Sequence, residues 1–186
     1  LAWAAPARSM PSFVFDAAST QIAGNKIFLA RRVGARMAPG WLAAPDGSPI
    51  MESSSPPEGD VRGQDYLMLP LGGTRENGSH KGYGLLAIVT IMCEMLAGGS
   101  GWGHFFAAFK IEAFTDVEVF KDGMDNMLDS LINTKTAPGH DRVVYAGLLE
   151  DEEIEKRRQE GIPYHREVID WFESFSAEKG ISFDLT

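Results

Sequence analysis

The apolar run from Tyr83 to Ala97 constrains the fold of this chain more than any other segment. Glu94 is its only charged residue, and apolar side chains occupy nearly every face of the helix that the run predicts. A helix that is apolar all round is usually covered on every side in a core. The run is also short for a membrane span, which takes about 20 residues. The sequence therefore predicts a buried core helix and no membrane partner.

A glycine-rich stretch, Gly78 to Leu85, leads into this run and reads Gly-Ser-His-Lys-Gly-Tyr-Gly-Leu. Glycine lets a backbone approach a ligand closely because it has no Cβ. Lys81 falls at the expected helix start, where backbone N–H groups lack partners and the helix dipole is positive. This combination suits a phosphate or a carboxylate. The alternative is an ordinary turn with a solvated lysine.

Bounded apolar runs and helical patterns follow one another along the rest of the chain. The bounded runs predict short strands, and apolar residues at helical spacing predict helices. Thr115 and Glu118 form a capping-box pattern, so Thr115 is expected to cap the helix behind it. The expected strands are residues 13–15, 105–114 and 142–145, and the expected helices are residues 19–33, 117–131, 150–159 and 166–179.

Composition excludes several classes of protein. The 17 Lys and Arg residues against 26 Asp and Glu residues give a net charge of −9, which argues against a nucleic-acid partner. Cys93 is the single cysteine, so no disulfide can form within the chain, and a reducing cytoplasm is expected. The four histidines are scattered without metal-ligand spacing, and no nucleophile motif is present, so no metal site is expected.

Several ordered stretches resemble the malate/L-lactate dehydrogenase family, which includes ureidoglycolate, sulfolactate and diketogulonate enzymes. Their order along the chain makes the resemblance far more specific than any one of them. The stretches are Pro11–Thr20, Ala38–Trp41, Asp46–Pro49, Leu69–Gly73, Ser79–Leu85, Gly103–Phe106 and Gly161–Pro163.

The resemblance implies a three-layer α/β domain with a mixed sheet, which binds NAD or NADP without the Rossmann fold. Residues 1–149 are expected to form part of this NAD(P)-binding domain, and residues 150–186 a C-terminal helical segment. The substrate is expected to be a small 2-hydroxy or 2-oxo acid, and the full protein is expected to be a homodimer. The family's catalytic histidine and substrate arginine belong to an N-terminal region, so this chain alone is expected to be inactive.

The resemblance also implies three sets of cofactor contacts. An alternative interpretation of Asp16 is an ordinary helix N-cap. Tyr145-Ala146-Gly147-Leu148 departs from the family's usual Ile-Pro-Gly-Glu, which puts the third set in doubt. No catalytic residue is assigned, because His80 matches the cofactor loop. The expected contacts are Asp16, Ala17, Ala18, Ser19 and Thr20; His80, Lys81 and Gly82; and Ala146 and Gly147.

Two other functions stay open at this point. One is a catalytically inactive relative that acts as a binding or structural subunit. The other is a reductase of cyclic imino acids, since some relatives in the family reduce C=N bonds. The choice between NAD and NADP depends on a basic residue near the ribose, and Arg31, Arg32 and Arg75 are equal candidates.

Overall fold

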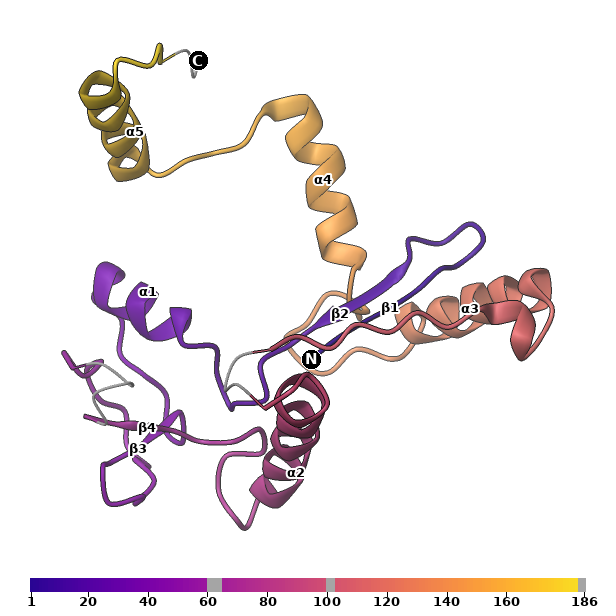
Figure 1. The fold of residues 1–186 in the computed structure, drawn as a ribbon, viewed down its shortest axis with the longest axis horizontal. Coiled ribbons are helices and arrows are strands. Elements are labelled where there is room, and N and C mark those ends of the chain that lie inside the picture. Colours follow the sequence, from indigo (N-terminus) through magenta and orange to yellow (C-terminus); the bar gives the residue numbers. More distant parts are fainter. Residues whose placement is uncertain (60–64, 100–102, 184–186) are drawn as a thin grey trace.

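The structure is a computed structural model that describes residues 1–59, 65–99 and 103–183. It is an α/β fold with helices arranged around two small sheets (Figure 1). The first part of the chain contains β1 (Ala2–Ala5), β2 (Phe13–Asp16), α1 (Asn25–Val33), β3 (Leu42–Ala43) and β4 (Leu67–Met68). The second part contains α2 (Ser79–Thr90), a π-helical turn (Ile91–Met95), a 3-10 turn (Ile111–Ala113), α3 (Val117–Ile132), α4 (Leu148–Glu160) and α5 (Arg166–Lys179).

Both sheets in the described residues are antiparallel pairs, β1 with β2 and β3 with β4. The expected mixed sheet is therefore not present in this part of the chain. Parallel strands need a long crossover connection, whereas only the short segment 6–12 joins β1 to β2. The hairpin pairs Ala5 with Phe13 at its loop end and Ala2 with Asp16 at its open end.

The core lies between α1 and the β3–β4 pair. Its buried members are Ile22, Ile27, Met37, Leu42 and Tyr66, and Trp41, Ile50 and Met68 pack against them. The region of irregular backbone after α1 thus supplies much of the buried apolar surface. Its close packing is why residues 35–59 can hold a fixed path with so little regular structure.

The apolar helix predicted for Tyr83–Ala97 forms, but it is not buried here. It consists of α2 followed by the π-helical turn. Tyr83 is 69% exposed and Ile88 is 53% exposed, and Gly82 is the one buried residue of α2. The prediction of burial is wrong for the described residues, because no second layer of helices or strands packs against this helix within them.

Two helix starts differ from the sequence predictions. The helix expected from Ser19 or Thr20 begins at Asn25, because Thr20 is held in a β-bridge with Pro70. The cap of α3 is Asp116 rather than Thr115, since the Asp116 carboxylate accepts hydrogen bonds from the backbone N–H groups of Glu118 and Val119. A carboxylate one residue later in the chain therefore takes the role predicted for the threonine hydroxyl.

The strands predicted at 105–114 and 142–145 are not paired. Residues 103–110 run without regular hydrogen bonding and end in the 3-10 turn, while residues 142–145 lead directly into the turn before α4. Apolar alternation can favour an extended backbone, but a strand also needs a neighbour with which to form its ladder. Because no other strand pairs with either segment among the described residues, both strand predictions are wrong for this part of the chain.

The last two helices match their predictions closely. The helix α4 ends at Gly161, and α5 runs from Arg166 to a left-handed Gly180, where φ is 64°. In Figure 1, α4 and α5 extend away from the two sheets and are joined by an extended linker. The described residues leave out parts of both regions expected from the sequence: 60–64 and 100–102 of residues 1–149, and 184–186 of residues 150–186.

Candidate functional site: a turn and a glycine loop joined at Leu71

The Asp16–Thr20 turn extends the hairpin by one residue pair beyond β2, and the chain then turns away from the hairpin. The N-terminal amino group of Leu1 donates to the carbonyl oxygen of Ala17 at 2.9 Å, and the Ala17 N–H donates back to Leu1 at 3.0 Å. Thr20 then folds the chain away, since its hydroxyl donates to the carbonyl oxygen of Ile22 at 2.7 Å. The turn therefore has a fixed backbone, and Asp16 is exposed at the end of β2.

The turn is hydrogen-bonded to the loop that precedes α2. The Leu71 N–H donates to the carbonyl oxygen of Ser19 at 3.0 Å, and the Gln21 N–H donates to that of Leu69 at 2.7 Å. The Oε1 of Gln21 accepts from the Gly72 N–H at 3.0 Å. Two of the three predicted contact sets are thus brought together. Gln21 is not among the predicted contacts, and only its position directly after the Asp16–Thr20 motif could have indicated it.

Gly82 holds α2 against this junction. A Cβ at Gly82 would lie 2.5 Å from the backbone nitrogen of Leu71 and 2.8 Å from its carbonyl carbon, which no real side chain tolerates. Leu71 therefore touches both parts of the candidate site, through its N–H to Ser19 and through its backbone to Gly82. The first turn of α2 is set directly beside the Asp16–Thr20 turn as a result.

The first turn of α2 is electropositive. Its N-cap, Gly78, has φ of 89° and gives no side-chain cap, and no acidic residue lies in the first turn. His80 and Lys81 are both exposed there, and the Lys81 chain folds over Gly78, with Nζ 3.7 Å from the position of a Gly78 Cβ. Lys81 has no ion-pair partner in the part of the chain that the structure describes. An anion is the natural ligand for such a helix start.

Ala146 and Gly147 lie against β2 rather than against α2. The carbonyl oxygen of Ala146 accepts from the Val14 N–H at 2.9 Å. Gly147 has φ of 103°, and a Cβ there would lie 2.7 Å from the Ser12 carbonyl oxygen, so only glycine fits. The hydroxyl of Tyr145 donates to the Pro11 carbonyl oxygen at 2.9 Å, and burial raises the pKa of that phenol.

The two helix starts near β2 differ in charge. The first turn of α4 contains Glu150 and Asp151, which already complement the helix dipole, whereas α2 has no acid there. An anionic group is therefore better placed at α2 than at α4. Within residues 1–59, 65–99 and 103–183, no group of three or more His, Cys, Asp or Glu side chains could hold a metal ion, and no helix could cross a membrane.

The sequence model of the malate/L-lactate dehydrogenase family matches residues 1–173. This chain belongs to the malate/L-lactate dehydrogenase family. The resemblance drawn from the ordered motifs is confirmed, including its extent along nearly the whole chain.

Individual relatives agree with this assignment. A malate dehydrogenase from Pyrococcus abyssi is 32% identical over 97% of this chain, which covers 52% of that protein. A Δ1-pyrroline-2-carboxylate reductase from Ancylobacter novellus is 34% identical over 50% of this chain and 22% of its own length. The crystal structure of malate dehydrogenase from Entamoeba histolytica matches 99% of this chain and 55% of that chain, with a TM-score of 0.90 at 28% identity. The chain thus spans about half the length of these two malate dehydrogenases.

Proposed function

We propose that this chain carries part of the cofactor site of an oxidoreductase that transfers hydride between NAD or NADP and a small 2-hydroxy or 2-oxo acid. Family membership supports the reaction class. The observation that carries the proposal is the position of Leu71, which joins the Asp16–Thr20 turn to the electropositive first turn of α2. A dinucleotide offers hydroxyl groups and phosphates, and these two turns offer complementary partners for both.

The residues of the site have distinct roles in this proposal. Asp16, exposed at the end of β2, accepts hydrogen bonds from ribose hydroxyls, and the backbone of Ala17 to Thr20 shapes the pocket wall. Lys81 and the open start of α2 bind phosphate, with His80 beside them. When bound, the nicotinamide supplies or accepts the hydride. Gly82 contributes by allowing the close approach of α2 to Leu71.

Ala146 and Gly147 form the third contact through their backbone. They lie next to Val14, two residues before Asp16 along β2. The acids in the first turn of α4 disfavour phosphate, so we assign these residues to an uncharged part of the cofactor. The substitution of the family's usual proline and acid leaves this backbone role intact, because Gly147 still has its left-handed conformation.

The three arginines considered for NADP have different partners, which supports a choice among them. The Arg31 guanidinium donates to the carbonyl oxygen of Gly59 at 2.7 Å and also to that of Pro57. Arg32 pairs with Glu167 of α5 at 3.5 Å. Arg75 lies in the turn just before α2, where its one recorded charge interaction within the described residues is with the neighbouring Glu76, and we propose it as the contact for a 2′-phosphate. A preference for NADPH that is lost in Arg75→Ala would support this assignment.

The direct test is a fluorescence titration of the protein with NADH and NADPH, followed by assays of two substrate classes. Reduction of malate-like 2-oxo acids supports the proposed function. Reduction of cyclic imino acids alone favours the second candidate, which the similarity to the pyrroline-carboxylate reductase supports. Absence of cofactor binding in the complete protein would leave only the inactive binding or structural subunit.

The proposal includes a cytoplasmic homodimer, which sedimentation and cell fractionation would test.

A further inference from the structure

The outer edge of β1 has unpaired backbone groups. Leu1 and Ala17 exchange both backbone hydrogen bonds, so the antiparallel register makes Trp3–Phe15 and Ala5–Phe13 the next bonded pairs. The N–H and C=O groups of Ala2 and Ala4 consequently point away from β2. On the other side of the hairpin, the Val14 N–H also points outward and reaches Ala146. Ala2 and Ala4 have no such partner among the described residues.

A second extended backbone faces this edge. The strand predicted for residues 105–114 overlaps this segment, yet the N–H groups of residues 103–110 donate no backbone hydrogen bond within the described part of the chain. Between this segment and β1 lies a groove of about 1010 Å³. The Trp3 and Phe109 rings meet across it with centroids 5.9 Å apart. Two unpaired extended backbones therefore border one apolar space.

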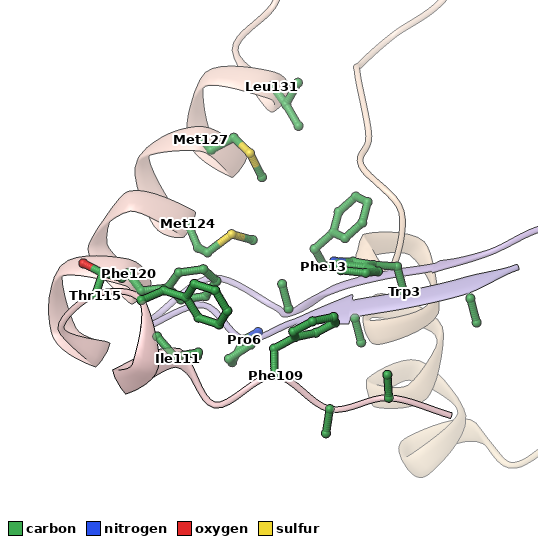
Figure 2. A pocket seen from close by; sticks show the side chains of 16 residues that line it. Trp3, Pro6, Phe13, Phe109, Ile111, Thr115, Phe120, Met124, Met127 and Leu131 are labelled. Atoms are coloured by element: carbon green, nitrogen blue, oxygen red, sulfur yellow. The ribbon is translucent and has the colours of Figure 1, made fainter. Parts of the chain in front are cut away.

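Figure 2 shows how the third wall of the groove is built. Phe120, Met124, Met127 and Leu131 project from one face of α3 toward the hairpin and the segment that carries Phe109. The walls formed by β1 and by residues 107–109 carry the small side chains of Ala2, Ala4, Ala107 and Ala108 beside the Trp3 and Phe109 rings. At the alanines another backbone can approach closely, and the flexible methionines of the third wall can adapt to its side chains.

We propose that this groove receives an added β-strand: an extended apolar segment of the polypeptide that the relatives have and this chain does not span. The incoming strand would pair with the outward groups of Ala2 and Ala4 on one side and with residues 103–110 on the other. Its apolar side chains would pack on the methionine face of α3. This mode of binding uses main-chain hydrogen bonds for affinity and side-chain pockets for specificity.

The surface area supports an occupant of this size. The chain exposes 13865 Å², about 5,000 Å² more than the roughly 8,800 Å² of a compact protein of its 20.3 kDa mass. A standard protein–protein contact covers only about 800 Å² per partner. The chain spans 52% of the Pyrococcus abyssi relative, so the rest of such a polypeptide is large enough to cover this excess.

Two other occupants fit less well. A small apolar ligand needs a few convergent polar anchors, but the side chains of the lining offer only the Thr115 hydroxyl and the Trp3 indole N–H, and the remaining polar groups are backbone. A second copy of this chain seated in the groove would bring two net charges of −9 together, so we assign the proposed homodimer to another face. An added strand needs no side-chain anchors, because its own backbone would form hydrogen bonds with the unpaired backbone groups that border the groove.

The test uses the 186-residue chain and a set of fluorescent peptides. The peptides, about 12 residues long to contain one strand, overlap and cover the part of the Pyrococcus abyssi malate dehydrogenase that this chain does not match. Binding is measured by polarisation, and hydrogen exchange reports the amides of Ala2 and Ala4. We expect an apolar peptide to bind and to slow exchange at both amides and along residues 104–110.

Two variants and a control locate the strand. Ala4→Pro removes an outward N–H without breaking a bond to β2, and should weaken peptide binding about tenfold or more. Met127→Glu, in the groove, should weaken it as well. Val119→Glu, at a 63% exposed position of the same helix outside the groove, should leave binding unchanged. Circular dichroism checks that all three variants keep their helices.

Three results would overturn the proposal. The first is that no peptide in the set binds. The second is binding that leaves the Ala2 and Ala4 amides unprotected or is insensitive to Ala4→Pro. The third is a dimer of the chain, seen in sedimentation, that Ala4→Pro dissociates, because the occupant would then be a second copy.

Discussion

Gly82 and Gly84 are both glycines of α2, and only one of them is required by packing. A Cβ at Gly82 would overlap the backbone of Leu71, while a Cβ at Gly84 meets nothing within 4 Å. Gly82→Ala should therefore destabilise the protein by about 1–3 kcal/mol through overpacking. Gly84→Ala should stabilise it by about 0.5–1 kcal/mol, because alanine is the better helix residue. Urea unfolding of the two variants gives the comparison, and equal effects would contradict the contact with Leu71.

Lys81 is expected to act on cofactor binding rather than on stability. A cation in the first turn opposes the helix dipole, so Lys81→Gln should leave the melting temperature unchanged or slightly higher. A charge-assisted contact to phosphate is worth about 1.5–3 kcal/mol, so NAD(P)H affinity should fall about 10- to 150-fold. Titration of Lys81→Gln beside Lys135→Gln, an exposed lysine after α3, separates this local effect from net charge. A lower melting point with unchanged affinity would make Lys81 structural.

At the scale of elements, a polar clamp fixes the hairpin loop to α3. The Asp125 carboxylate accepts backbone N–H groups from Arg8 at 2.9 Å and Ser9 at 3.0 Å, and also the Ser9 hydroxyl. Arg8 pairs with Glu118 at 2.5 Å and with Asp122. This clamp sets the angle between the hairpin and α3, and so the width of the apolar groove between them.

The clamp gives stability a dependence on acid pH. The hydrogen bond from the Ser9 hydroxyl and those from the backbone lower the pKa of Asp125 from 3.8 to about 2. The stabilisation is present above the unfolded pKa and is lost as the pH falls through the folded one. Asp125→Asn should therefore melt earlier than the wild type at neutral pH, and the difference should shrink near pH 2. Thermal melts at several pH values, with Asp129→Asn as the control on the same helix, measure this.

At the scale of the whole molecule, the chain alone is expected to lack dehydrogenase activity. The family resemblance assigns the general acid/base histidine to a region that the motifs of this chain do not include. Loss of a general acid/base typically costs about 10²–10⁴-fold in rate, and loss of substrate contacts adds to this. The measurement is NADH oxidation with malate-like and lactate-like 2-oxo acids. Robust turnover by the purified 186-residue chain would show that the proton carrier is present after all.

Local chemistry made part of this protein predictable from its sequence. The ends of α4 and α5 follow from Gly161, Pro163 and Gly180, because glycine readily adopts the positive φ that ends a helix and proline cannot continue one. The ordered motifs gave the family and the two turns of the candidate site. Neither result needs knowledge of which segments pack together.

The tertiary structure decided what depends on neighbours. Leu71 joins two turns far apart in sequence, and Gln21 locks them, which no local spacing indicates. The apolar residues 105–114, which alternate from Phe109 to Ala113, predict a strand, but a ladder requires a partner backbone. The apolar side chains of α2 indicate that another segment covers this helix, but they do not identify that segment. Propensity acts within a few residues, whereas pairing and burial are properties of the whole assembled fold.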